Sequence, residues 1–179
     1  MIVCSRTVNA FTMTIDPFVG TWLSIGSVSY RSKLEFIDGK PDPMGVVNWL
    51  NGKGDNSIAD ITPAEGLTLT ITKEGDFQEE KTAEPEIQWF NASGELSPDV
   101  QPFSGTLSEY HLKVYLIDND APHWSKSKSK PKKNRYADGD TTIADMLEIR
   151  DEKLVRTVSV VTDEMYFDRV IIVYQRQEQ

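Results

Sequence analysis

The sequence has few of the residues that bind metals or form disulfides. Its 179 residues include one cysteine, Cys4, and two histidines, His111 and His123. A single cysteine excludes an intramolecular disulfide and a cysteine-based zinc site, and it makes a reducing compartment the default expectation. Two histidines are too few for a histidine-rich metal centre. We therefore predict no metal site and a cytoplasmic location.

Long apolar runs are also missing, and basic residues are in the minority. No stretch approaches the roughly 20 apolar residues that span a bilayer, and residues 1–16 lack the apolar region of a signal peptide. The chain has 19 Lys and Arg against 28 Asp and Glu, a formal net charge of −9. Nucleic-acid binding depends on neutralising phosphates. The composition therefore predicts neither a membrane nor a nucleic-acid partner, and it leaves the oligomeric state open.

Sequence motifs of cofactor chemistry are absent. The chain contains no Gly-x-Gly-x-x-Gly, no Gly-x-x-x-x-Gly-Lys and no Gly-x-Ser-x-Gly, the patterns of dinucleotide sites, phosphate loops and serine nucleophiles. The lone Cys4 lies in the N-terminal segment, which argues against Cys–His catalysis. We expect no cofactor, and neither hydride nor phosphoryl transfer.

The pattern that dominates the sequence is an alternation with period two. The alternating runs are rich in Val, Ile, Thr, Tyr and Phe, which favours strands. They cover residues 31–37, 67–72, 110–117, 154–161 and 166–176. Asp38-Gly39 and Asn51-Gly52 are typical turn pairs, and 151–153 and 162–164 resemble hairpin connections. About nine or ten strands at this spacing predict an antiparallel barrel or sandwich.

Two stretches interrupt the alternation. Residues 73–98 are acidic and polar, which suggests a short helix or a loop over one end of a barrel. Residues 118–142 include a Lys/Ser-rich run and predict a long loop near the barrel mouth; loops of this length are commonly functional or disordered. The interpretation that follows is an N-terminal segment over residues 1–16, a candidate lid, and one barrel domain over residues 17–179.

Several short motifs occur in a suggestive order. They are Gly20-x-Trp22, Asp42-Pro-x-Gly45 with an expected strand at 47–52, Phe103-Ser-Gly-Thr106, His111–Leu116 with Pro122-His-Trp124, and Val173-Tyr-Gln-Arg176. Together they resemble the lipocalin-like domain family of the calycin superfamily. The chain departs from that pattern where Tyr110-His111 replaces two adjacent histidines and where His123 replaces an asparagine.

The resemblance implies a single up-and-down antiparallel β-barrel of eight to ten strands with an internal cavity. A barrel of about eight strands is wide enough to hold one small ligand. Lipocalin-fold proteins of bacterial and fungal secondary metabolism include cofactor-free cyclases, among them Diels–Alder and hetero-Diels–Alder enzymes, and simple carriers. The resemblance therefore implies either a cyclase or isomerase acting on a polyketide- or terpenoid-like intermediate, or a non-catalytic carrier of a small hydrophobic molecule. A protein-interaction module is a third reading, favoured only if the barrel is filled.

The family pattern assigns structural roles to Gly20, Trp22 and Arg176. In calycins the tryptophan of the first strand closes one barrel end and packs against an arginine late in the chain. Arg176 is the first choice for that partner, and Arg156 the second. A guanidinium over an indole face makes a cation–π contact.

The candidate catalytic groups belong to residues 110–117 and to the segment after them. If the apolar face of this predicted strand points inward, Tyr110 becomes a hydrogen-bond donor in the cavity. If the cavity is polar, His111 and Tyr115 point inward as an acid/base pair, because histidine changes its charge near neutral pH. His123, expected at the barrel mouth, is the fourth candidate.

The candidate ligand-binding residues are mostly aromatic, since aromatic side chains combine apolar area with a polar edge. Trp49 either lines the cavity or plugs it, and Trp124 either grips a ligand at the rim or only covers the rim. The complete predicted set is Trp49, Trp124, Tyr30, Phe36, Leu112 and Tyr174. On residues 144–150, Glu148 and Arg150 are expected on the solvated face, opposite Asp145 and Leu147. If the Glu148 carboxylate pointed inward and was buried instead, it would be a functional candidate.

Overall fold

The computed structural model describes residues 14–33, 36–37, 39–90, 94–98, 100–119 and 133–178. The predicted site residues His123 and Trp124 lie outside the described residues, as does most of the N-terminal segment 1–16. The described part contains no helix that is long and apolar enough to cross a membrane.

The described residues form mostly strands, with one short 3₁₀ helix and one α-helix. In chain order the elements are η1 (Asp16–Phe18), β1 (Gly20–Lys33), β2 (Phe36–Ile37), β3 (Lys40–Pro41), α1 (Pro43–Leu50), β4 (Thr62–Pro63), β5 (Leu67–Ile71), β6 (Asp76–Lys81), β7 (Trp89–Phe90), β8 (Leu96–Ser97), β9 (Ser104–Tyr110), β10 (Lys113–Asp118), β11 (Tyr136–Asp138), β12 (Thr141–Arg150), β13 (Lys153–Thr162) and β14 (Tyr166–Arg176).

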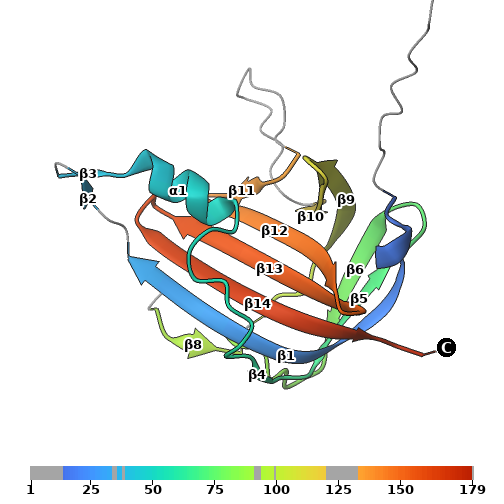
Figure 1. Cartoon of the computed structure of the whole chain (residues 1–179). Coiled ribbons are helices and arrows are strands. Elements are labelled where there is room, and N and C mark those ends of the chain that lie inside the picture. Colours follow the sequence, from blue (N-terminus) through green and yellow to red (C-terminus); the bar gives the residue numbers. More distant parts are fainter. Residues whose placement is uncertain are drawn as a thin grey trace, which may run out of the picture.

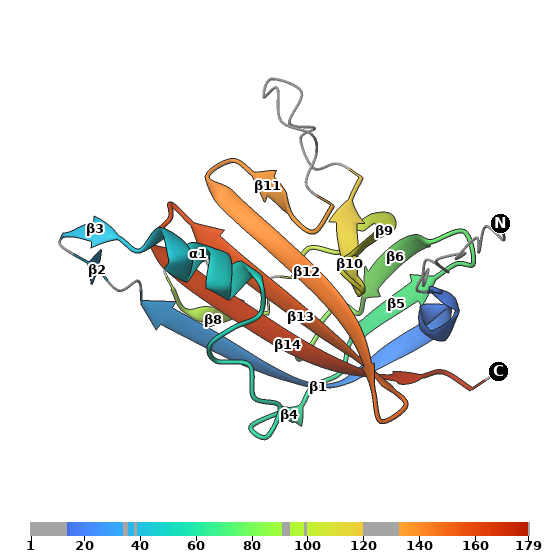
Figure 2. The ribbon, with the colours of Figure 1, turned by 45° about the horizontal axis from the view of Figure 1, so that its top comes forward.

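Eight of these strands close into an up-and-down antiparallel barrel (Figures 1 and 2). Each barrel strand pairs with the next one along the chain, in the order β1, β5, β6, β9, β10, β12, β13 and β14, and β14 pairs back to β1. The β10–β12 seam is short, with Val114 opposite Leu147 and Tyr115 opposite Met146. This is the topology of lipocalin-type barrels, so the predicted fold class is confirmed.

The interior of the barrel follows from the period-two alternation. On β13, Leu154, Val158 and Val160 point into the main hydrophobic cluster, while Val155 and Val161 belong to two separate clusters on the outer side. All but the end residues of β13 and β14 are buried, since both faces of these strands are covered. Long apolar runs without a solvated face are the sequence signature of such strands.

Helix α1 covers the outer face of the barrel, and it corrects a prediction. Residues 47–52 were expected to form a strand, but α1 spans Pro43–Leu50. Asp42 is the N-cap, with its Oδ1 accepting the Met44 N–H at 2.9 Å, and Pro43 occupies the first turn. Both are helix-start signals. Val46, Trp49 and Leu50 have helical spacing and pack together in the outer cluster under α1.

A buried arginine fastens the end of α1 to the barrel. Arg169 on β14 is fully buried, and its Nη2 donates to the carbonyl oxygens of Trp49 at 2.6 Å and Lys53 at 3.0 Å. Its guanidinium lies 3.8 Å from the Trp49 ring centroid. Carbonyls at a helix C-terminus carry partial negative charge. Burial nevertheless lowers the pKa of Arg169 to about 10. Trp49 is therefore a structural residue outside the lumen.

The predicted contact between Trp22 and Arg176 is present in the structure. The two residues are paired across β1 and β14, and the Arg176 guanidinium lies 4.2 Å from the Trp22 ring centroid. Arg176 also donates to the carbonyl oxygens of Val19 and of Pro17, the latter at 2.7 Å. Gly20 has φ of +135°, and a Cβ there would meet the guanidinium. The Gly-x-Trp motif thus leaves room for the arginine that covers the barrel end.

Arg176→Ala should lower the free energy of unfolding by about 2 kcal/mol. It removes a cation–π contact worth ~0.5–2 kcal/mol and charged hydrogen bonds worth ~1.5–3 kcal/mol each, partly replaced by water. Urea denaturation followed by tryptophan fluorescence measures the loss. Arg150→Ala is the control, because its ion pair with Glu148 is exposed and such pairs contribute ~0–1 kcal/mol. Equal losses in the two variants would contradict the closure role.

Candidate functional site

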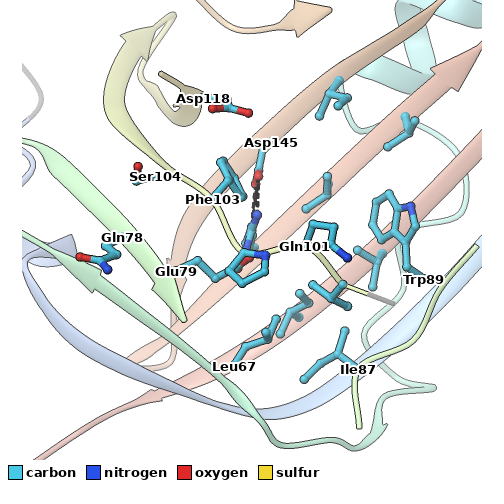
Figure 3. Close-up of a pocket in the computed structure, with 18 of the residues that line it drawn as sticks. Leu67, Gln78, Glu79, Ile87, Trp89, Gln101, Phe103, Ser104, Asp118 and Asp145 are labelled. Carbon is cyan, nitrogen blue, oxygen red and sulfur yellow. Dashed lines mark hydrogen bonds and ion pairs between the residues drawn. The ribbon is translucent and has the colours of Figure 1, made fainter. Parts of the chain in front are cut away.

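A cavity of about 760 Å³ occupies the barrel lumen. Strands β5, β6, β10, β11, β12, β13 and β14 contribute to its wall, together with Ile87, Trp89 and residues 100–104. Figure 3 shows Trp89 and Gln78 at opposite sides of the view, with Glu79, Phe103 and Asp145 between them. A volume in this range suits a small organic ligand. The lumen is therefore not filled by side chains.

The wall is about equally apolar and polar, and its charged groups lie together in one region. The apolar part is made mainly by aliphatic residues of the central strands and by Trp89. Its main members are Leu67, Ile87, Trp89, Val158, Val170 and Ile172. The polar part contains the carboxylates of Glu79, Asp118 and Asp145, the Arg156 guanidinium and Tyr136. A ligand with both apolar surface and a polar group matches such a wall.

Arg156 is the centre of the polar region. From β13 it holds Asp145 of β12 in a two-pronged pair, with Nε–Oδ1 at 2.9 Å and Nη2–Oδ2 at 2.7 Å. Its Nη1 donates to Oε2 of Glu79 on β6, and to the Tyr174 hydroxyl at 3.4 Å. The three charged side chains are each at most 5% exposed. One buried cation thus serves two buried carboxylates.

The ratio of one guanidinium to two carboxylates determines the charge of the site. If both carboxylates ionise, the group carries one excess negative charge in a buried setting, which is costly. Burial raises the pKa of Glu79 and of Asp145, despite the opposing attraction of Arg156. The two carboxyls act as a coupled pair that holds a proton to higher pH than free carboxyls do. A proton held in this way is available for acid–base chemistry at a higher pH than the proton of a free carboxyl.

Two polar atoms of the wall are open to a ligand. Arg156 donates its hydrogen bond to Oε2 of Glu79, and the other oxygen, Oε1, accepts no hydrogen bond among the described residues. The Tyr136 hydroxyl likewise forms no hydrogen bond within the described residues, and desolvation raises its pKa. Asp145 is different, since both of its oxygens face Arg156. Glu79 and Tyr136 are therefore two groups of the wall that can meet a ligand in the cavity.

The structure corrects the predicted strand over residues 110–117. His111 and Leu112 form the turn between β9 and β10, with φ of 48° and 60°. Tyr110 is 39% exposed and Leu112 71% exposed, at the tip of this hairpin. A turn reverses the chain, so the assumed alternation across it does not hold. Tyr110, His111 and Leu112 do not line the cavity, whereas Val114 and Leu116 point inward as expected.

The other predicted site residues also lie away from the cavity wall. Tyr115 is buried on the side opposite Val114 and Leu116, where it is hydrogen-bonded to Asn134 and its pKa is raised by burial. The Tyr30 hydroxyl donates to the Ser57 carbonyl oxygen at 2.7 Å on the outer side. Phe36 lies in β2, where only the backbone is described, and β2 pairs with β3 outside the barrel.

Among the described aromatic residues of the predicted ligand-binding set, Tyr174 is the one that lies inside the barrel. It is fully buried in the main cluster, below Arg156, and burial raises its pKa. It is not part of the cavity wall. Its contribution to the site is therefore to support Arg156. Glu148 and Arg150 form an exposed ion pair at 2.8 Å, as predicted for the solvated face.

The sequence interpretation missed Glu79 and assigned Arg156 only as a possible partner of Trp22. One signal was present: Arg156 interrupts the apolar run Leu154–Val161, and a charge in the centre of a doubly buried strand requires a partner. Glu79 follows Phe77 at the i+2 spacing of one strand face. Asp145 likewise lies two residues from Leu147, on the same face of its strand. The partner of each charged residue is set by how the strands close into the barrel. A local sequence pattern does not contain that information.

Comparisons with known proteins give distant likenesses among solved structures. No protein-family model matches the chain, and no curated protein matches it. Among solved structures it is similar to zebrafish ileal bile acid-binding protein complexed with cholic acid, with 14% identity, a TM-score of 0.33, and coverage of 90% of this chain and 99% of that one. It is also similar to the S-type phycobiliprotein lyase CPES from Guillardia theta, with 9% identity, a TM-score of 0.31, and coverage of 92% and 91%. The assignment of the barrel fold rests on the strand pairing of this chain and not on these comparisons.

Glu79→Gln should change how stability depends on pH. Because the pKa of Glu79 is raised in the folded state, the folded protein binds a proton more tightly than the unfolded chain. This contribution to stability is present below the unfolded pKa and is lost as pH rises through the folded pKa. Relative to the wild type, the variant should gain stability as pH rises from the pKa of Glu79 in the unfolded chain through its higher pKa in the folded state. The gain should be about 1.4 kcal/mol for a folded-state pKa that lies one pH unit above that of the unfolded chain.

Urea denaturation at several pH values measures this difference. Glu80→Gln is the matched control, because Glu80 is the exposed neighbour on the same strand and its variant makes the same charge change. A stability difference between Glu79→Gln and wild type that does not vary with pH would contradict the raised pKa.

Proposed function

We propose that this protein is a cofactor-free enzyme that binds a small, partly apolar intermediate in the barrel and promotes its cyclisation or isomerisation. The activity we infer belongs to secondary metabolism in the cytoplasm, and a Diels–Alder or hetero-Diels–Alder cyclisation is the specific version. The second candidate is a non-catalytic carrier of a small hydrophobic molecule. A purely apolar wall would favour the carrier, and convergent acidic groups favour the enzyme.

The observation that supports the enzyme is the buried cluster of Glu79, Asp145 and Arg156 in the cavity wall. It combines a proton donor of raised pKa with an open oxygen, Glu79 Oε1, at the surface of the lumen. The burial of the three charged side chains strengthens each polar interaction among them. Binding a flexible substrate in one folded conformation adds the benefit of proximity, worth up to ~10⁵–10⁸ M in effective molarity.

In the proposed reaction, protonated Glu79 donates a hydrogen bond or a proton to a heteroatom of the substrate. That withdraws electron density from the reacting double bond and lowers the barrier to ring closure or to a shift of a double bond. Where the proton is transferred, the Glu79 carboxylate then takes one back from the rearranged molecule. The product is an isomer of the substrate and the enzyme returns to its starting state. Asp145 and Arg156 act by positioning Glu79 and by setting its pKa.

Incubation of the wild type with a metabolite extract of the source organism, followed by native mass spectrometry, tests this function. We expect one retained small molecule and an isomer of it that is absent from a control without protein. Glu79→Gln should retain the molecule but form the isomer at least ~100-fold more slowly, in line with the usual 10²–10⁴-fold contribution of general acid–base catalysis.

The two candidate functions give different results in this experiment. Recovery of one unchanged compound from the wild type, Glu79→Gln and the Glu80→Gln control alike would support the carrier and contradict the enzyme. The absence of any retained compound in all three proteins would contradict both, since each requires the cavity to bind a ligand.

A further inference from the structure

We infer that the ligand of this cavity carries a basic nitrogen and binds as a cation beside Glu79. This inference rests on the proposed function, because it specifies the substrate class of the same cavity. The occupant that fits is an amine or imine with an apolar body, held by an ion pair between its N–H⁺ group and Glu79 Oε1.

The charge balance of the cluster favours a cationic ligand. Glu79 and Asp145 share one guanidinium, and all three groups are buried. With both carboxylates ionised, the cluster is one positive charge short. In the empty protein a proton can supply that charge, and in the complex an ammonium or iminium group can replace the proton. Buried charges are stable when they are paired and hydrogen-bonded.

The engagement of Arg156 disfavours an anionic ligand. Its Nε and Nη2 face the Asp145 carboxylate, and its Nη1 faces Glu79 and Tyr174. The Phe103 ring lies 5.1 Å from the guanidinium carbon. A ligand carboxylate or phosphate would have to displace one of the protein's own carboxylates to reach this cation, and would then face the displaced charge. The cavity is therefore unsuited to anions.

The open acceptor of the wall is a carboxylate oxygen. Glu79 is only 4% exposed, and its Oε1 accepts no hydrogen bond among the described residues. The Tyr136 hydroxyl and the Trp89 ring line the same cavity. An N–H⁺ donor can bond to the carboxylate and the hydroxyl, and aromatic faces attract cations. The neighbourhood thus favours a positively charged donor over a neutral acceptor.

A basic nitrogen also gives the proton of the cluster a role in the reaction. A neutral imine or amine that enters the cavity takes the proton from the Glu79 carboxyl, which leaves an ion pair and no net change in charge. A protonated imine is a stronger electrophile than a carbonyl compound, and cyclisation onto its carbon followed by return of the proton to Glu79 gives an isomeric product. No external oxidant, reductant or co-reactant enters this balance.

A matched set of naphthalene probes tests the charge preference. The probes are 2-naphthylmethylamine as the cation, 2-naphthylmethanol as the neutral molecule and 2-naphthylacetate as the anion. Isothermal titration calorimetry at pH 7 should give an affinity for the amine at least ~10-fold above the affinity for the alcohol, because hydrogen bonds to charged groups are the stronger ones. The anion should bind most weakly.

The pH dependence adds a readout that does not need a variant. Below the pKa of the Glu79–Asp145 pair, binding of the protonated amine must release about one proton, which is counted by titration in two buffers of different ionisation enthalpy. Amine affinity should rise as pH rises through the pKa of the Glu79–Asp145 pair, and alcohol affinity should stay constant. The titratable groups of the wall around Glu79 are Asp118 on β10, Tyr136 on β11, Asp145 on β12, Arg156 on β13 and, beneath it, Tyr174 on β14.

Variants separate Glu79 from the general negative charge of the protein. Glu79→Gln should abolish both the preference for the amine and the proton release, with little change for the alcohol. Glu80→Gln should bind all three probes as the wild type does. Equal or tighter binding of the alcohol or the anion to the wild type would overturn the basic-nitrogen inference while leaving the ligand-binding cavity supported. Failure of all three probes to bind would overturn this inference and count against the proposed function as well.

Discussion

The buried guanidinium of Arg156 is the interaction on which the lumen depends. It connects β13 with its neighbours β12 and β14 and, across the lumen, with Glu79 on β6. Strands β6 and β13 share no hydrogen bonds in the barrel, so this ion pair is a cross-link between opposite walls. Removing one member of such a cluster would leave an uncompensated buried charge, which commonly costs ~3–5 kcal/mol. The cluster therefore fixes the spacing of the walls as well as the chemistry of the cavity.

The two arginines on the long C-terminal strands show how the same charge serves two purposes. Arg169 faces outward from β14 and is satisfied by backbone carbonyl oxygens and by Ser159, with the Trp49 ring against it. It holds α1 and the chain after it against the barrel and leaves no group for a ligand. Arg156 faces inward and is satisfied by carboxylates, one of which keeps an open oxygen. The contacts of Arg169 on the outer side make the barrel wall more rigid. A rigid wall helps Arg156 and its carboxylate partners keep their geometry inside the barrel.

The sequence predicted the barrel better than it predicted the site. The predicted strands over 67–72, 154–161 and 166–176, the hairpins at 151–153 and 162–164 and the Trp22–Arg176 contact depend on neighbours in sequence or on a known pairing, and they are confirmed. The stretch 73–98, predicted as a short helix or a loop, instead contains β6. The predicted strand over 110–117 was wrong because His111 and Leu112 form a turn. Neither histidine nor leucine is a typical turn residue, so the sequence contains no signal of this turn. Trp49 was misplaced because the N-cap at Asp42 was interpreted as part of a turn. The cluster of Glu79, Asp145 and Arg156 joins residues up to 77 positions apart, and only the closed barrel brings them together.

The cost of the cluster bears on the choice between a carrier and an enzyme. Replacing a buried ion pair or triad by apolar residues of similar volume is often neutral, or stabilising by ~1–4 kcal/mol. A barrel that only stores an apolar molecule would lose nothing by such a replacement, because apolar contacts with the wall would supply the affinity. A barrel that must move a proton, or balance the charge of a basic nitrogen, needs a buried group with a raised pKa and a fixed partner beside it. Glu79 has that environment, with Asp145 and Arg156 to maintain it, and this is the physical reason to favour turnover over storage.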